Sequence, residues 1–301
     1  MLTTTAIPSW FSAAVRSAAD EGVVLVEGAF IAYRAWGDPR NHGVVLVHGG
    51  AAHSRWWDHI APLIADQGYR VVALDLSGHG DSARRETYNL DLWAAEVMAV
   101  SQAAGMTGTS TVIGHSMGGF VALKTSMLFG SGIAGTIVID SPLRELTIEE
   151  SAFVASIPVE PHRLHSTFDA AMKRFRPVPD QPVQDYIAAY VASHSVHSVT
   201  GGWAWKFDPG VALRGHLPPS TIRVPRHRLA FIRGERGLLS RGMVHAMFDT
   251  LGGPAADVEI PDSGHHIMLD RPLALVSALR ALLAAWAYPD YSSAAVTGGG
   301  R

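Results

Sequence analysis

The chain has no cysteine, no excess of basic residues and no long apolar run, and each absence excludes a class of protein. Without cysteine there are no disulfides, no thiolate metal ligands and no cysteine nucleophile. The 24 Lys and Arg residues stand against 27 Asp and Glu, a formal net charge of −3, which argues against a nucleic-acid-binding module. The most apolar late stretch, residues 272–288, is broken by Arg280 and is shorter than the ~20 residues of a membrane span.

The rest of the composition is typical of a globular protein. Hydrophobic residues make up 48% of the 301 residues and charged residues 17%, so the chain has enough apolar material for a sizeable core. Residues 1–5 lack the basic start and the following apolar run of a secretory signal. We therefore expect a cytoplasmic protein with a small-molecule substrate and no membrane or nucleic-acid partner. The sequence predicts no particular oligomeric state.

Strand-length apolar runs alternate with helix-length amphipathic stretches along most of the chain. Most runs are continuous in Val, Ile and Leu, which is typical of strands buried on both faces of a parallel sheet. The predicted strands are 23–26, 30–35, 44–47, 71–76, 111–113, 136–139, 229–232 and 258–260. The predicted helices are 56–66, 90–104, 118–129, 238–251 and 272–286. This alternation predicts an α/β fold with helices on both faces of a mostly parallel sheet, whose first two strands form an edge hairpin.

The alternation is interrupted once, between the sixth and seventh predicted strands. Residues 142–226 contain no clear buried strand and instead predict helices near 147–157, 168–175 and 183–194. We therefore predict a helical lid over one end of the sheet, inserted into a core formed by residues 1–141 and 227–288. The tail, residues 289–301, has too few apolar groups to pack and is predicted to be disordered.

The strongest chemical signal is the motif Gly114-His115-Ser116-Met117-Gly118. It follows a predicted strand and opens a predicted helix. A turn this tight forces its central residue into a strained conformation, and small residues two before and two after it avoid clashes. The turn lifts the hydroxyl of Ser116 clear of the sheet edge, beside the positive end of a helix. Ser116 is therefore the candidate nucleophile.

A serine hydroxyl needs a base and, in acyl transfer, donors for the developing oxyanion. His265 follows the last predicted strand, which brings it to the same sheet edge as Ser116, so we assign it as the base. The glycine-rich turn after the third strand lets backbone N–H groups face a ligand. The predicted oxyanion donors are the N–H groups of Gly50 and Met117.

Four motifs in this order make residues 22–287 resemble the α/β-hydrolase superfamily. They are His48-Gly49-Gly50, the segment 75–82 that reads Asp-Leu-Ser-Gly-His-Gly-Asp-Ser, the Ser116 turn, and Gly264-His265 followed by Asp270 and Pro272. The resemblance implies an eight-stranded, mostly parallel sheet, a helical cap after the sixth strand and a Ser–His–acid triad.

The acid of that triad departs from the common pattern of the family. The usual acid follows the seventh strand, where residues 233–240 read Arg-Gly-Glu-Arg-Gly-Leu-Leu-Ser and offer no Asp in the expected position. A subset of the superfamily carries its acid directly after the sixth strand, a position that Asp140 occupies here. A carboxylate there would fix the tautomer of the His265 ring and stabilise its imidazolium form. We therefore favour Asp140 and keep Glu235 as the alternative acid.

A serine nucleophile implies transfer of an acyl group to water through an acyl-enzyme, unlike the Asp nucleophile of dehalogenases and epoxide hydrolases of this fold. The leading hypothesis is a cofactor-independent serine hydrolase that cleaves a small, fairly apolar carboxylic ester or a lactone. Hydrolysis of a thioester or of a carbon–carbon bond on the same triad is one alternative. A ligand receptor with slow turnover and a cofactor-free oxygenase are two more.

Large aromatic side chains near these motifs and in the lid are candidate walls of the substrate pocket. They are Trp56, Trp57, Phe120, Trp203, Trp205 and Phe207. We predict no metal site, because the adjacent side chains of His265 and His266 should diverge and the lid histidines have no Asp or Glu that completes a ligand set. No cofactor is predicted either.

Overall fold

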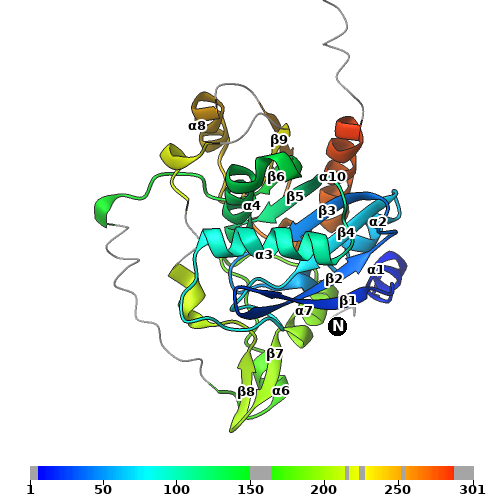
Figure 1. Ribbon diagram of the computed structural model, residues 1–301. Coiled ribbons are helices and arrows are strands. Elements are labelled where there is room, and N and C mark those ends of the chain that lie inside the picture. Colours follow the sequence, from blue (N-terminus) through cyan, green and yellow to red (C-terminus); the bar gives the residue numbers. More distant parts are fainter. Residues whose placement is uncertain (1–5, 150–163, 214–216, 224–227, 252–254, 288–301) are drawn as a thin grey trace, which may run out of the picture.

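The computed structural model describes residues 6–149, 164–213, 217–223, 228–251 and 255–287 (Figure 1). Most of the helix predicted at 147–157, the last residues of the predicted lid and the tail at 289–301 lie outside these described residues. The division into a core of residues 1–141 and 227–288 and a lid of residues 142–226 stays a prediction.

All eight predicted strands are confirmed, and they form one sheet. They are β1 (Asp20–Val26), β2 (Ala29–Trp36), β3 (His42–Val47), β4 (Tyr69–Leu74), β5 (Ser110–His115), β6 (Ile133–Ile139), β9 (Arg228–Gly234) and β10 (Ala256–Ile260). Their order in the sheet is β1-β2-β4-β3-β5-β6-β9-β10. The pairs β1–β2 and β2–β4 are antiparallel and the other pairs are parallel, so the predicted mostly parallel sheet is confirmed.

The edge hairpin β1–β2 is also confirmed, and its turn explains why it forms. Glu27 and Gly28 connect the two strands and have φ angles of 42° and 80°. Two consecutive residues with positive φ make the turn whose twist matches that of the flanking strands. Glycine accepts this conformation without a steric cost, which fixes the register of the hairpin.

Helices cover both faces of the sheet. They are α1 (Ser9–Val15), α2 (Ala61–Ala65), α3 (Leu90–Ala103), α4 (Met117–Phe129), α8 (Arg241–Leu251), α9 (Ile267–Asp270) and α10 (Pro272–Ala287), with the 3-10 turns η1 (Ser54–Trp57) and η2 (Gly130–Gly132). The helix predicted at 56–66 is split into η1 and α2. Pro62 lies in the first turn of α2, where its missing N–H costs nothing, and a longer helix would place it in the interior.

The core consists of two apolar layers, one on each face of the sheet. Along β3, Val45 and Val47 contribute to the layer formed with α3, α4 and α8. Val44 and Leu46 point the other way, into the layer formed with α1, α2 and α10. This alternation follows from the two-residue period of a strand and explains why β3 is apolar without interruption.

The segment between β6 and β9 forms a separate layer of short elements. They are α6 (Phe168–Met172), α7 (Asp185–His194), β7 (Val196–Val199), β8 (Gly202–Trp205), η3 (Pro209–Leu213) and η4 (Pro219–Thr221). The helices predicted near 168–175 and 183–194 are thus confirmed. The hairpin β7–β8 is a difference from the expected helical lid: its strands are only four residues long and half exposed, so they leave no continuous apolar run in the sequence.

This segment lies across the loops that follow the strands. The N–H of Gly80 donates to the carbonyl of Lys206 at 2.6 Å, and the N–H of Asp208 donates to the carbonyl of Gly78 at 2.7 Å. Figure 1 shows α6 and the β7–β8 hairpin beyond one end of the sheet. Because the carboxyl ends of parallel strands share one edge, the loops after β3, β5, β6, β9 and β10 all meet there, which is where ligands bind in such sheets. Within the described residues, no helix has the length and apolarity that crossing a membrane requires. The cytoplasmic location stays a prediction.

Candidate active site

Ser116 stands on a sharp turn between β5 and α4. Its φ and ψ are 53° and −120°, a strained combination for a residue with a side chain. The neighbouring glycines explain how the turn closes: a Cβ on Gly114 would lie 1.9 Å from the carbonyl oxygen of Gly118, and one on Gly118 would lie 2.4 Å from that of Val47. The glycine spacing read from the sequence therefore has a direct steric cause.

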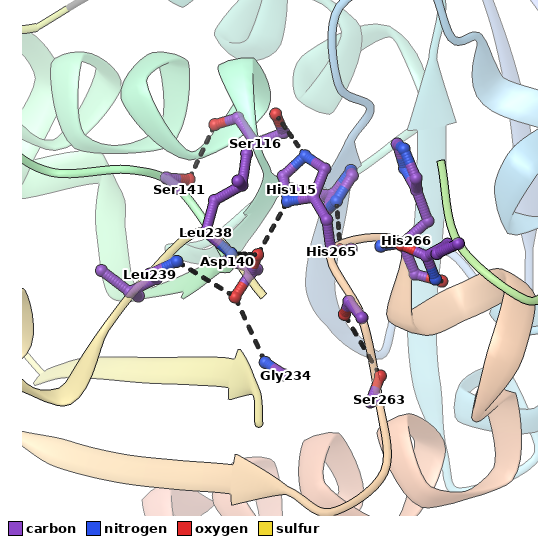
Figure 2. A network of polar contacts seen from close by, with 12 residues as sticks. His115, Ser116, Asp140, Ser141, Gly234, Leu238, Leu239, Ser263, His265 and His266 are labelled. Carbon is purple, nitrogen blue, oxygen red and sulfur yellow. Dashed lines mark hydrogen bonds and ion pairs between the residues drawn. The ribbon is translucent and has the colours of Figure 1, made fainter. Parts of the chain in front are cut away.

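His265 bridges Ser116 and Asp140 through its two ring nitrogens (Figure 2). The Ser116 hydroxyl lies 3.0 Å from Nε2 of His265, and Nδ1 of His265 lies 2.7 Å from Oδ2 of Asp140. With Nδ1–H donating to the carboxylate, Nε2 is left as the acceptor that faces the hydroxyl. The structure thus brings together the three residues that the sequence assigns to nucleophile, base and acid, from the ends of β5, β10 and β6.

The carboxylate of Asp140 is fully buried and held by backbone donors. Its Oδ2 also accepts the N–H of Leu238 at 2.7 Å, and its Oδ1 accepts those of Gly234 at 3.2 Å and Leu239 at 3.4 Å. A Cβ on Gly237 would come within 2.1 Å of Oδ1. The loop after β9, where the common pattern would place the acid, instead wraps the carboxylate that follows β6.

Glu235, the alternative acid, points elsewhere. Its Oε2 accepts the backbone N–H of Asp262 at 2.7 Å, and no contact with the His265 ring is found among the described residues. The geometry therefore favours Asp140, because a carboxylate must reach Nδ1 of the base to orient it.

The loop after β3 lies against the Ser116 turn. A Cβ on Gly49 would be 3.2 Å from Cβ of Ser116, and one on Gly50 would be 3.8 Å from Sδ of Met117. Met117 is the first residue of α4, so its N–H has no acceptor inside the helix. The two predicted oxyanion donors therefore belong to adjoining loops beside the serine. His48 bonds its own loop, through Nδ1 to the carbonyl of Gly49 at 2.7 Å.

Two further imidazoles pack against the His265 ring. The ring centroids of His115 and His266 each lie 4.7 Å from that of His265, so the adjacent His265 and His266 rings do not diverge as expected from the sequence (Figure 2). Burial holds the pKa of His115 well below its usual value and lowers the pKa of His266 to about 3. Both neighbours are therefore neutral near pH 7 and add no positive charge beside the base.

His115, His265 and His266 also bring three ring nitrogens within 4.8 Å of one another, close enough to be considered as ligands of a metal ion. Four of their nitrogens are already hydrogen-bonded, whereas Nδ1 of His266 has no partner among the described residues. Both nitrogens of His265 are bonded, Nε2 of His115 donates to the carbonyl of His265 at 3.0 Å, and Nε2 of His266 donates to that of Val178 at 3.1 Å. A metal ion could bind all three only by displacing Ser116 or Asp140 from His265.

A second serine–histidine contact joins the core to the segment that follows β6. Nε2 of His53 lies 2.8 Å from Oγ of Ser195, and both residues are buried. The Ser195 hydroxyl donates to the carbonyl of Val191 at 2.7 Å, so the His53 ring must be the donor between them. None of the bonds described for His53 involves a carboxylate. We interpret this pair as an anchor for α7.

The six predicted pocket aromatics fall in three settings. Trp57 and Phe120 lie in the two apolar core layers. Trp56 is the one whose ring adjoins the catalytic loop, 5.5 Å from the His266 ring and 6.0 Å from Phe175. The remaining three lie after β6: Trp203 packs on Phe168, Trp205 packs on His165 and Phe175, and the backbone of Phe207 forms a β-bridge with that of His79.

Two residues that support the site escaped prediction from sequence. Ser141 donates from Oγ to the carbonyl of Ser116 at 2.7 Å, and Oγ occupies the space that a Cβ on Gly119 would need. His115 holds the carbonyl of His265. The signal for both was their position, since each directly adjoins a member of the triad in sequence. Their roles depend on where neighbouring strands place them, which the sequence alone does not specify.

Comparison with known proteins agrees with this geometry. The profile of the Alpha/beta hydrolase family matches residues 44–279. The chain belongs to the alpha/beta hydrolase family. This alpha/beta hydrolase is 30% identical to a non-heme chloroperoxidase of Streptomyces lividans over 139 residues, which span 46% of this chain but only half of the relative's length.

Two other similarities of this alpha/beta hydrolase extend over most of the chain. An esterase of Mycobacterium tuberculosis is 27% identical over 269 residues, covering 85% of this chain and 87% of the relative. The solved structure of the thioesterase domain from the curacin biosynthetic pathway superposes with a TM-score of 0.73 at 23% identity, covering 87% of this chain and 99% of that domain. At that identity the likeness to the thioesterase domain shows the fold alone.

Proposed function

We propose that this alpha/beta hydrolase is a serine hydrolase that cleaves a small, fairly apolar carboxylic ester or a lactone through an acyl-enzyme. The observation that carries the proposal is the hydrogen-bonded chain from Ser116 through His265 to Asp140. Family membership supports hydrolytic chemistry, and the similarity to an esterase over most of both chains supports a carboxylic ester as the substrate.

In the first half-reaction, Oγ of Ser116 attacks the carbonyl carbon of the ester while Nε2 of His265 takes the hydroxyl proton. The electron pair of the carbonyl double bond moves onto its oxygen, and the N–H groups of Gly50 and Met117 stabilise that charge. The oxyanion then collapses, the ester C–O bond breaks, and the leaving alkoxide takes the proton from His265. The products are a free alcohol and an acyl group on Ser116.

In the second half-reaction, water attacks the acyl carbon while His265 takes its proton. Collapse of this oxyanion breaks the bond to Ser116, whose oxygen recovers the proton from His265, and the carboxylic acid leaves. Asp140 keeps its charge throughout. Its contribution is to hold the Nδ1–H tautomer of His265 and to stabilise the ring while it is positively charged.

The side chains beside the site support an apolar substrate. Trp56 and Phe175 supply apolar surface beside the loop of His265. The described contacts place no unpaired cation beside Ser116, so nothing there favours a charged acyl group. These features support an apolar acyl group over a carboxylate-bearing one.

The experiment is a turnover screen with p-nitrophenyl acetate, butyrate and octanoate, a γ-lactone and a thioester, for the wild type, Ser116→Ala and Ser195→Ala. We expect repeated turnover of at least one oxygen ester or lactone, its loss in Ser116→Ala, and its retention in Ser195→Ala, which removes only the second serine–histidine pair. Turnover that survives in Ser116→Ala would exclude the mechanism.

The same screen separates the alternatives. A single acylation event without further turnover would indicate a ligand receptor. Thioester cleavage far above ester cleavage would redirect the substrate assignment. Activity that requires dioxygen and survives the loss of Ser116 would indicate a cofactor-free oxygenase.

A further inference from the structure

The backbone on both sides of His265 is held by hydrogen bonds from three different parts of the chain. The N–H of Gly264 donates to Oδ2 of Asp270 at 2.7 Å, and the carbonyl of His265 accepts Nε2–H of His115 at 3.0 Å. The next N–H, that of His266, donates to Oε1 of Gln181 at 2.8 Å. The backbone of Gly264, His265 and His266 is thus hydrogen-bonded to α9, to β5 and to the segment after β6, respectively.

Gln181 is the member of this set that comes from the segment after β6. Its Nε2 donates to Oδ2 of Asp270 at 2.9 Å and approaches the carbonyl of His266 at 3.4 Å. Its side chain also fills the space above Gly264, where a Cβ would meet Oε1 at 2.7 Å. The amide therefore satisfies an N–H and a carboxylate oxygen in the same loop, a match that neither an acid nor an amine could reproduce.

Neighbouring residues reinforce the same contact. His266 donates from Nε2 to the carbonyl of Val178 at 3.1 Å, and the N–H of Gln184 donates to the carbonyl of Leu269 at 2.9 Å. The side chain of Gln184 reaches the carbonyl of Asp270 at 3.3 Å. Residues 178–184 thus run along the loop that carries the base, and Gln181 is the one whose side chain lies next to His265 in that loop.

We propose that Gln181 is a positioning residue that sets the orientation of His265 toward Ser116 and so couples the segment after β6 to the reactivity of the serine. The inference rests on the proposed function, in which His265 is the base. His266 and Asp270 are buried. Without the amide, Oδ2 of Asp270 keeps only the N–H of Gly264 among the described residues, and the N–H of His266 loses its bond and would have to find a new acceptor by moving the backbone of the loop. A displacement of that backbone moves Nε2 of His265 relative to the hydroxyl.

The first test compares Gln181→Met with Gln184→Met. Methionine keeps the length and packing of glutamine but makes none of its hydrogen bonds, and Gln184→Met removes a bond to the same loop farther from the base. We expect kcat on a p-nitrophenyl ester to fall about ten- to hundredfold in Gln181→Met with KM within about twofold of wild type. Gln184→Met should stay within about twofold in both constants. A rise in KM with kcat unchanged would indicate a role in substrate binding and would overturn the proposal.

The second test uses Gln181→Glu and the pH profile of kcat/KM. The glutamate keeps the acceptor for the N–H of His266, but its second oxygen replaces the donor 2.9 Å from Oδ2 of Asp270. The two carboxyls share a proton at low pH, and the negative charge that is added as this proton leaves favours the protonated His265 ring. We expect the acid limb of the profile to move to higher pH, by up to about one unit. Destabilisation alone would lower activity at every pH without moving the limb. The charged or titratable groups that face the His265 ring and its loop are Asp140, His115, His266, Asp270 and Arg271.

The reaction of each variant with a fluorophosphonate keeps the two proposals separate. Loss of labelling in Ser116→Ala together with wild-type kcat in Gln181→Met and an unmoved acid limb in Gln181→Glu would overturn this inference alone. Labelling and turnover that persist in Ser116→Ala would overturn the proposed function and this inference with it. If Gln181→Met does not fold, the pH profile of Gln181→Glu tests the inference: a shift of the acid limb to higher pH supports it, and an unmoved limb overturns it.

Discussion

Replacing Asp140 by asparagine removes the charge of the acid while keeping its shape. In the wild type, Oδ2 accepts two bonds of 2.7 Å, from His265 and Leu238, and Oδ1 accepts longer bonds of 3.2 and 3.4 Å from Gly234 and Leu239. The asparagine oxygen should therefore take the Oδ2 position, because this keeps the two short bonds. The amide nitrogen then faces the weaker pair of donors.

This orientation determines the size of the effect. His265 keeps its tautomer, so the loss is that of one charge-assisted bond to the imidazolium, about 1.5–3 kcal/mol. That energy corresponds to a fall in kcat of about 10- to 150-fold. The opposite orientation would turn the tautomer and bring the loss to about 10⁴-fold. In addition, the N–H groups of Gly234 and Leu239 would face the NH2 group of the asparagine in place of Oδ1. This loss of two hydrogen bonds should lower the free energy of unfolding by about 1–3 kcal/mol.

The assay is steady-state hydrolysis of a p-nitrophenyl ester, normalised to the fraction of protein that a fluorophosphonate labels, with urea unfolding in parallel. Glu235→Gln is the matched control. Gln keeps the acceptor for the N–H of Asp262, so kcat should change less than about threefold. A larger loss in Glu235→Gln than in Asp140→Asn would refute the assignment of the acid.

Three further predictions concern stability and the turn. Gly118→Ala should lower stability by about 1–3 kcal/mol and reduce turnover, because its Cβ would lie 2.4 Å from the carbonyl oxygen of Val47; an unchanged melting temperature would contradict this. Tyr190→Phe removes the hydrogen bond of 2.6 Å from Oη to the buried Asp58 and should lower the free energy of unfolding in urea by about 1–2 kcal/mol. An unchanged free energy of unfolding would contradict this and would mean that packing alone holds α7 in place. Burial lowers the pKa of six neutral histidines below the unfolded value of 6.5, so the free energy of unfolding falls as pH drops below that value, by up to about 1.4 kcal/mol per histidine and pH unit. Three buried carboxyls, whose pKa burial raises, partly offset this loss. The urea midpoint should therefore drop between pH 7 and 5, and a constant midpoint would contradict the assignment. The histidines are His48, His53, His59, His79, His115 and His266, and the carboxyls are Asp58, Glu96 and Asp270.

The parts of the fold that were predictable from sequence are those with strong local signals. Continuous apolar runs mark strands buried on both faces, and the glycines around Ser116 mark a turn with no room for a Cβ. Since parallel strands end at one edge, the order of the motifs was enough to bring Ser116 and His265 together. Asp140 was favoured over Glu235 through the resemblance to those members of the superfamily whose acid follows the sixth strand.

The parts that were not predictable depend on contacts between distant segments. The hairpin β7–β8 consists of short, half-exposed strands with no periodic apolar signal. Gln181 is an isolated polar residue whose partners lie 85 and 89 residues away along the chain. Nothing in its own neighbourhood specifies that its amide fits an N–H and a carboxylate in the loop of the base.

The most direct test of the account is to trap the acyl-enzyme. The protein is mixed with a p-nitrophenyl ester, quenched with acid during turnover, digested, and the peptides are examined by mass spectrometry for the mass of the acyl group. The account predicts the added mass on the peptide that contains Ser116, its loss in Ser116→Ala, and its slower formation in His265→Ala. Acylation at another residue while turnover proceeds at full rate would contradict it.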